Sequence, residues 1–448
     1  MSELRVIAQH AGTVLVGQLA VMAFGVTDTI VAGRYAEQAL AALSVGSAVY
    51  ATVFVALMGM LQALLPTWAR LHGAKRHEDV GRSVRQALYL AAFALLVGAW
   101  ALLFPEAILR WTEVPPTLQR LVGGYLGVLI FALPPALLLR MFSTLNQSLG
   151  KPRLVTWLQA ASLLLKIPLT IWFVFGGLGL PAQGVIGCAW ATVTVNWLLL
   201  ASAVVLLRTQ PLYRPYAIWR RIEAPDWRAI GHFARLGVPG GLAVLVEVTS
   251  FTLMALFIAR QGVLASAAHQ VAANVAAVLY MTPLSIGIAT SARVSYWLGA
   301  DDDDRAGQAI RKGFQLGLAL ALTLSGIVAF GRWHIAAIYS GNPQVVALAA
   351  ALLAWVAGYH LGDAVQGLCV FVLRCYHVAV APLVAYCVLL WGIGLSGGYA
   401  LAYHPAAPAL LRQSPAALWA GSTIALALLA VVLPLILRHA VRSHRAAH

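Results

Sequence analysis

The chain has 448 residues, of which 61% are hydrophobic and only 10% are charged, and its mean hydropathy is +0.82. A soluble domain carries about 25% charged residues, so this composition excludes a soluble protein of this size. Apolar runs of roughly 20 residues recur along the chain, and each can cross the ~30 Å hydrocarbon core of a bilayer as a helix. The sequence therefore predicts an all-α integral membrane protein.

Twelve apolar segments are candidate transmembrane helices. They lie near residues 12–33, 40–65, 86–104, 121–141, 154–176, 184–206, 236–258, 266–290, 312–331, 345–371, 379–401 and 416–437. The terminal and even-numbered loops hold 23 of the 30 Lys and Arg, and the opposite loops hold 6. The positive-inside rule then predicts that both termini are cytoplasmic, in a multi-pass protein of the inner (plasma) membrane. The same asymmetry accounts for the net charge of +15, so no nucleic-acid partner is expected.

Two loop segments in different halves of the chain resemble each other. "HGAKRHEDVGRSVRQA" matches "LGADDDDRAGQAIRKG", and Gly81 and Arg85 correspond to Gly307 and Arg311 at an offset of 226 residues. Internal similarity of this kind indicates two copies of one six-helix unit. Because each copy has six spans, both have the same orientation, which predicts a pseudo-two-fold axis along the membrane normal.

The repeat divides the chain into three parts. We expect an N-terminal six-helix lobe at residues 1–206, a basic cytoplasmic linker at 207–235 and a C-terminal six-helix lobe at 236–448. Two lobes that rock around a midplane cavity are typical of secondary transporters.

Only three of the fifteen acids lie within predicted spans: Asp28 in the first, Glu247 in the seventh and Asp363 in the tenth. A charge at the centre of a membrane costs at least about 2.5 kcal/mol on insertion scales, so such residues are usually functional. A buried carboxylate can hold a proton, or it can bind Na⁺ together with other oxygens. We expect these acids to couple an ion gradient to movement of the lobes; the structural alternative for each is a hydrogen bond between helices.

Lys166 is the one base assigned to the interior of a span, about 18 Å from the start of the fifth. That depth prevents easy snorkelling, and a buried lysine needs a carboxylate or loses its proton. Asp28 is the only acid within spans of the same lobe, so an Asp28–Lys166 pair is predicted. The alternative is a neutral lysine that lines a wet cavity.

Further polar side chains surround the second-lobe acids. Tyr359 and His360 precede Asp363 by four and three residues and share its helix face. Tyr359 can supply an oxygen to an ion, and His360 either passes a proton or packs between helices. Four polar residues of the seventh and eighth spans either line the cavity or bridge helices: Thr249, Ser250, Gln270 and Asn274.

Several enzymatic signatures are absent from the sequence. The loops contain no catalytic His/Ser/Cys constellation, and the chain has no Walker motif. "GIGLSGG" at 392–398 fits GxGxxG, but it lies in a predicted span and indicates close helix packing instead. We therefore expect a non-enzymatic protein without a cofactor, a dedicated metal site or a catalytic residue, which uses H⁺ or Na⁺ as its coupling ion.

With these features the chain resembles the multidrug and toxic compound extrusion (MATE) family, in its NorM-type branch. The resemblance rests on "VTDTIVAGR", "LNQSLGKPR", "GVPGGLAVLVEVTSF" and "AAHQVAANVAAVLYMTPLSIGIATSARV". It implies export of organic cations and other amphiphilic toxic compounds in exchange for inward Na⁺ or H⁺. The essential acids of the family match Asp28, Glu247 and Asp363, and its second-lobe cation site matches Glu247 and Asp363, with Tyr359 nearby.

The fifth span departs from the family pattern. Lys166 stands where NorM-type proteins tend to have asparagine, and Thr170 stands in place of a further polar amide. A lysine there would occupy the place of a cation beside Asp28, whereas the second-lobe site is unaffected.

Three other functions fit the sequence less well than transport. A flippase for lipid-linked precursors, from a related two-lobed fold, is the nearest alternative; such proteins usually need cationic groups in the cavity. A membrane enzyme would need a catalytic cluster at one membrane face, and a channel fits poorly with two large linked repeats. The expected partners are small cationic or amphiphilic substrates and the lipid bilayer, and the expected state is a monomer.

Overall fold

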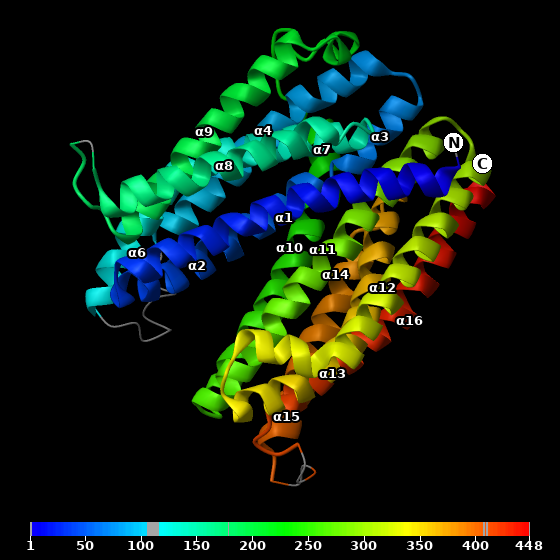
Figure 1. The fold of residues 1–448 in the computed structure, drawn as a ribbon. Coiled ribbons are helices and arrows are strands. Elements are labelled where there is room, and N and C mark those ends of the chain that lie inside the picture. The colour runs from blue at the N-terminus through cyan, green and yellow to red at the C-terminus, as the bar shows by residue number, and fades with distance from the viewer. Residues whose placement is uncertain (1, 105–115, 178, 406–407, 409–410, 448) are drawn as a thin grey trace. The chain divides into compact units, whose positions relative to one another are not determined.

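The computed structural model describes residues 2–104, 116–177, 179–405, 408 and 411–447. Over these residues the regular secondary structure is helical, apart from one isolated bridge between Gly177 and Leu180 (Figure 1). Twelve helical segments of this part are long and apolar enough to cross a membrane. The predicted all-α architecture with twelve spans is therefore confirmed.

The helices of the two halves follow each other in chain order. The first half contains α1 (Glu3–Tyr35), α2 (Glu37–Gln62), α3 (Leu65–Gly73), α4 (His77–Leu103), α6 (Pro116–Leu129), η1 (Ile130–Ala132), α7 (Leu133–Ser148), α8 (Arg153–Phe175), α9 (Val185–Thr209) and η2 (Pro211–Tyr216). The second contains α10 (Trp227–Ala259), α11 (Val263–Gly299), α12 (Asp303–Tyr339), α13 (Pro343–Cys375), α14 (Val380–Tyr386), η3 (Cys387–Gly397), α15 (Gly398–Tyr403) and α16 (Pro415–Ala447).

The chain forms two compact units, and their boundaries fall inside helices. One unit comprises residues 16–241, and the other comprises residues 1–15 together with 242–448. Helices α1 and α10 therefore each begin in one unit and end in the other. These divisions differ from the predicted boundaries at 206 and 236, which follow the ends of apolar segments and take no account of contacts.

Contacts of the first turns explain why residues 1–15 belong with the second half. Glu3 accepts hydrogen bonds from both Nη2 and Nε of Arg293, at 2.6 and 3.0 Å, and from Trp297 Nε1 at 3.1 Å. Ile7 and Ala11 are buried among apolar residues of that unit. The start of α1 is thus attached to the second unit by a bidentate ion pair and by apolar packing.

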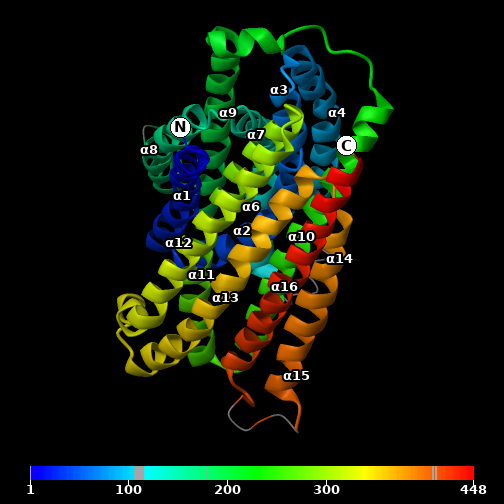
Figure 2. The same cartoon turned by 90° about the vertical axis from the view of Figure 1, so that its right-hand side faces the viewer.

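Helix α13 is the central element of the second unit. It packs against α11, α12 and α16, and the ribbon shows these helices running alongside it (Figure 2). Next to α16, η3 and the first residue of α15 carry the glycines of "GIGLSGG". A Cβ on Gly421 of α16 would meet the carbonyl oxygen of Gly394 at 2.6 Å and the Cα of Gly398 at 2.8 Å. Gly394 and Gly398 therefore allow close helix packing, as predicted for this motif.

The internal repeat is visible in local geometry. Helices α4 and α12 begin at His77 and Asp303, which are separated by the offset of 226 residues. Lys75 and Asp301 precede them, and both adopt left-handed backbone conformations, with φ of 58° and 55°. In each turn the next amide donates a 3.0 Å hydrogen bond to the carbonyl five residues before it. Both halves thus build this loop in the same way.

The basic segment after α9 packs on α4. Arg85 binds the Glu223 carboxylate through Nε at 2.8 Å and Nη2 at 2.5 Å, and its Nη1 donates to the Ala217 carbonyl at 2.7 Å. A Cβ on Gly81 would overlap the Tyr216 carbonyl oxygen, at 1.7 Å. Hydrogen bonding from Arg85 lowers the pKa of Glu223 to about 2. The segment is therefore folded against the first unit.

We expect Glu223→Gln to loosen this segment at neutral pH. Because the folded pKa is lowered, the charged pair stabilises the contact above the ordinary pKa of about 4.5, and this stabilisation is lost as pH falls towards 2. Hydrogen-exchange protection of residues 211–226 should fall roughly two- to fivefold in the variant, as for a partly exposed ion pair. In the wild type, protection should be constant from pH 8 to pH 5. Asp79→Asn, which breaks an exposed pair with Arg76 outside this segment, is the control.

Candidate functional site

The first site joins α1 to α8 within residues 16–241. Lys166 is fully buried, and its Nζ lies 2.8 Å from Asp28 Oδ1, as predicted for this pair. The ammonium group also donates to Thr192 Oγ1 at 2.7 Å and to the Cys188 carbonyl at 3.2 Å. Each of its three protons thus has an acceptor, which allows a charged lysine at a position that water does not reach.

Thr170 belongs to the same group. It lies one turn after Lys166, so the two side chains share a face of α8, and its Oγ1 donates to Asp28 Oδ1 at 3.3 Å. Among the described residues, both donors reach Oδ1 and no hydrogen bond reaches Oδ2. The structure therefore brings together the three residues that the sequence places in the first-lobe site.

A cavity of about 390 Å³ lies inside the same unit, with Asp28 and Thr192 on its wall. Most of its lining is apolar or aromatic, and Tyr50 and Tyr125 are among the aromatic residues. Small-molecule sites are typically concave and apolar with a few placed polar groups. Because Lys166 already neutralises Asp28, this carboxylate can attract an organic cation or hold a proton only when the pair separates.

Arg140 also lines this cavity, although sequence reasoning placed it at the start of a loop. It lies inside α7, is buried, and donates a hydrogen bond to Gln62 Oε1. Lys166 is therefore accompanied by another buried base in the same unit. A charge at the end of an apolar run cannot be assigned to a loop or a buried helix end from hydropathy alone.

The second site joins α10 to α13 within residues 242–448. Asp363 is buried, and its Oδ1 accepts a 2.9 Å hydrogen bond from Gln366 Nε2. The amide oxygen of Gln366 accepts a hydrogen bond from the Tyr386 hydroxyl. Glu247 is partly buried and lies close enough to Asp363 for the two groups to interact electrostatically. The structure thus brings together the two acids predicted for the second lobe.

A buried arginine balances part of this negative charge. Arg374 is 4% exposed and interacts electrostatically with Glu247. It lies in the last turn of α13, eleven residues or about three turns after Asp363, and hence on the same helix face. A buried carboxylate beside a partly buried one needs compensating positive charge, of which Arg374 supplies one unit. A proton or a cation can supply the other.

Tyrosines complete the surroundings of the two acids. Tyr359 interacts electrostatically with both acids, and its ring packs edge-on against Trp419 at 5.6 Å between centroids. Tyr280 and Tyr386, which the sequence analysis did not identify, also interact with this group. Hydroxyl and carboxylate oxygens are suitable ligands for hard cations such as Na⁺.

The remaining predicted residues form no hydrogen bond with Glu247 or Asp363 among the described residues. His360 is buried, and its Nε2 has no hydrogen-bond partner among the described residues. Gln270 Nε2 donates to Asn274 Oδ1 at 3.2 Å within α11, and Thr249 Oγ1 donates to the Leu245 carbonyl one turn earlier, at 2.6 Å. Ser250 is buried in α10.

Comparisons with known proteins agree with these features. The MatE family profile matches residues 14–172 and 239–400. The probable multidrug resistance protein NorM of Aromatoleum aromaticum is 38% identical, covering 97% of this chain and 93% of its own length. The multidrug resistance protein MdtK of Pectobacterium atrosepticum is 32% identical over 97% of this chain and 94% of its own.

Solved structures share the fold at lower identity. The eukaryotic MATE transporter AtDTX14 has a TM-score of 0.88 and 20% identity, with 99% of this chain and 98% of that chain covered. The bent form of the Vibrio cholerae MATE transporter VcmN has a TM-score of 0.85 and 17% identity over 99% and 98% of the two chains. The sequence matches extend over both halves, and the chain therefore belongs to the multidrug and toxic compound extrusion (MatE) family, in its NorM-type branch.

Proposed function

We propose that the protein is a secondary active antiporter that exports organic cations and other amphiphilic toxic compounds in exchange for inward H⁺ or Na⁺. One observation above all carries the proposal: each compact unit holds buried acids, and in the first unit Asp28 lines a cavity of about 390 Å³. A largely apolar cavity with a few polar groups on its wall suits a small amphiphilic compound. The names of the relatives, multidrug resistance proteins, support the same substrate class.

The second unit holds the proposed coupling site. Glu247 and Asp363 interact electrostatically, and within the described part of the chain Arg374 is the basic side chain that acts on Glu247. Uptake of a proton or Na⁺ neutralises the remaining negative charge, and its release restores that charge. Tyr359 supplies a further oxygen to a bound cation. Whether the two acids are neutralised thus sets the charge of this site. That charge shifts the equilibrium between the conformations in which the lobes open to one side of the membrane or to the other.

The first site has a different role, because a cation already occupies the place beside Asp28. The ammonium of Lys166 lies 2.8 Å from the carboxylate, which disfavours Na⁺ at the same point through repulsion. An Asp–Lys pair can still exchange a proton, and this consideration favours H⁺ over Na⁺ as the coupling ion. His360 and the polar residues of α10 and α11 are secondary candidates for the transport path.

We further propose that the protein is a monomer in the inner membrane with both termini in the cytoplasm. The distribution of Lys and Arg over the loops supports this orientation. Rocking of two lobes around a midplane cavity would expose the substrate site alternately to each side.

The proposal can be tested with proteoliposomes that contain a fluorescent organic cation. We expect efflux when a pH gradient is imposed alone, and no efflux with Glu247→Gln under the same gradient. Efflux driven by a Na⁺ gradient alone would place Na⁺ at Glu247 and Asp363 and make Lys166 a structural residue. Absence of efflux under either gradient would contradict antiport and favour the flippase for lipid-linked precursors.

A further inference from the structure

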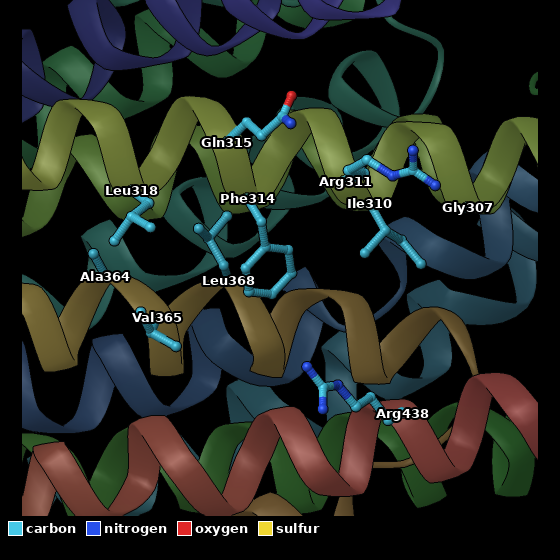
Figure 3. Close-up of a pocket in the computed structure, with 10 residues that line it drawn as sticks. All are labelled: Gly307, Ile310, Arg311, Phe314, Gln315, Leu318, Ala364, Val365, Leu368 and Arg438. Carbon is cyan, nitrogen blue, oxygen red and sulfur yellow. The ribbon is translucent and has the colours of Figure 1, made fainter.

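A second cavity, of about 660 Å³, lies in the other unit between α12, α13 and α16. Its apolar lining includes Phe314 and Leu318 of α12 and Val365 and Leu368 of α13 (Figure 3). Leu318 is 46% exposed, so the apolar lining continues to the outer surface of the helices. The cavity therefore offers a long apolar groove to a ligand that enters from the side.

Two arginines from opposite sides line this groove. Arg311 comes from α12 and Arg438 from α16, and Ile310 lies between them in the close-up (Figure 3). Both side chains are exposed, and among the described residues neither forms an ion pair or a hydrogen bond. Asp303 and Asp304, the nearby acids of α12, are already paired with His444 and Arg445. The groove thus combines an apolar surface with two uncompensated positive charges.

The internal repeat shows what an equivalent arginine can bind. Arg311 corresponds to Arg85, which binds the Glu223 carboxylate in a bidentate geometry at 2.8 and 2.5 Å. Beside that pair, the backbone of the same segment covers Gly81, the counterpart of Gly307. In the second unit Gly307 and Arg311 line the cavity instead. An arginine at this position in the fold can therefore bind an anionic group. In the second unit, no carboxylate of the described residues binds Arg311.

We propose that this groove binds an anionic phospholipid of the bilayer, with one acyl chain along the apolar walls and the phosphate against Arg311 and Arg438. Arginine binds phosphate oxygens through parallel hydrogen bonds, as Arg85 binds a carboxylate. The start of α12 and the end of α16 lie on the side that the charge count predicts to be cytoplasmic, where anionic lipids attract basic residues. The proposal requires only that the protein is embedded in a bilayer, so it does not depend on the proposed transport.

The test counts bound lipids by native mass spectrometry on the full-length protein. The probes are phosphatidylglycerol and phosphatidylcholine with identical acyl chains, each added to delipidated protein. We expect the wild type to retain one phosphatidylglycerol in preference to phosphatidylcholine. Arg311→Gln/Arg438→Gln should weaken that binding by roughly tenfold or more, because each arginine contributes to attraction of the anionic headgroup. Both residues are exposed, so the variant is expected to fold normally.

The matched control is Arg5→Gln/Arg442→Gln, which removes the same charge from the same unit at two exposed arginines outside the groove. It should keep the phosphatidylglycerol. Equal loss of phosphatidylglycerol from both double variants would overturn the proposal, because binding would then depend on the general charge of the unit. Equal binding of phosphatidylglycerol and phosphatidylcholine would also overturn it, because the groove would then not select an anionic headgroup. Displacement of the lipid by excess inorganic phosphate that itself binds would also overturn it, since the occupant would then be the free anion.

Discussion

Glu247→Gln is expected to reduce ion-driven efflux by roughly two orders of magnitude, the upper range of coupling between two ligands of one protein. Glutamine keeps the shape of the side chain but cannot change its charge when an ion binds or leaves. The negative charge of Asp363 and the positive charge of Arg374 would then compensate each other without a bound ion, since these are the charged groups that interact with Glu247. The measurement is gradient-driven efflux of a fluorescent organic cation from proteoliposomes.

The fold of this variant should be unaffected. Glu247 is partly buried, and an amide is less costly than a carboxylate to place in a membrane interior. The apparent melting temperature in detergent should be equal to that of the wild type or higher. Glu37→Gln, the same chemical change at an exposed position in the first turn of α2, is the matched control and should transport normally. Full efflux by Glu247→Gln would contradict the coupling role.

The acids of both sites could be identified from the sequence for a simple physical reason. A carboxylate within an apolar run is conspicuous, and only Asp28, Glu247 and Asp363 meet that condition. Lys166 is conspicuous in the same way. Its pairing with Asp28 could be predicted because Asp28 is the one acid within the predicted spans of that lobe. These inferences need only the cost of a charge in hydrocarbon and no knowledge of tertiary contacts.

The neutral partners of the sites could not be found in this way. Gln366, Tyr280 and Tyr386 lie in apolar segments without any pattern that separates them from ordinary packing residues. Their role near Asp363 depends on how α11, α13 and α14 pack, which a single sequence does not determine. Arg374 was hidden for another reason, because a basic residue at the end of a span resembles a topological loop charge.

Helix boundaries show a similar limit. The third span is predicted from 86, whereas α4 begins at His77, because its first turns are polar and pack against the basic segment after α9. Hydropathy detects the part of a helix that lies in lipid, and it misses polar turns that continue beyond it. The division of α1 and α10 between two units was missed likewise, since it depends on contacts and not on composition.

Lys166→Met is expected to destabilise the protein by about 3–5 kcal/mol, because it leaves Asp28 as a buried charge without its partner. The ammonium has three acceptors in the structure, so the variant also removes the donor to Thr192 and Cys188. Thermal or denaturant unfolding in detergent would measure the loss. Lys312→Met, at a partly exposed lysine that bonds only Gln315 among the described residues, is the control and should change stability little.

The double variant Asp28→Asn/Lys166→Met decides whether the two residues act as a pair. If Asp28 and Lys166 are charged mainly because each compensates the other, removing both charges should restore much of the stability, since no buried charge is left uncompensated. The double variant should then be no worse than the less stable single variant. Additive damage would show that Asp28 and Lys166 serve separate purposes, despite the 2.8 Å between them. Lys166 would then be held mainly by its bonds to α9, and Asp28 would remain available to a cation from the cavity.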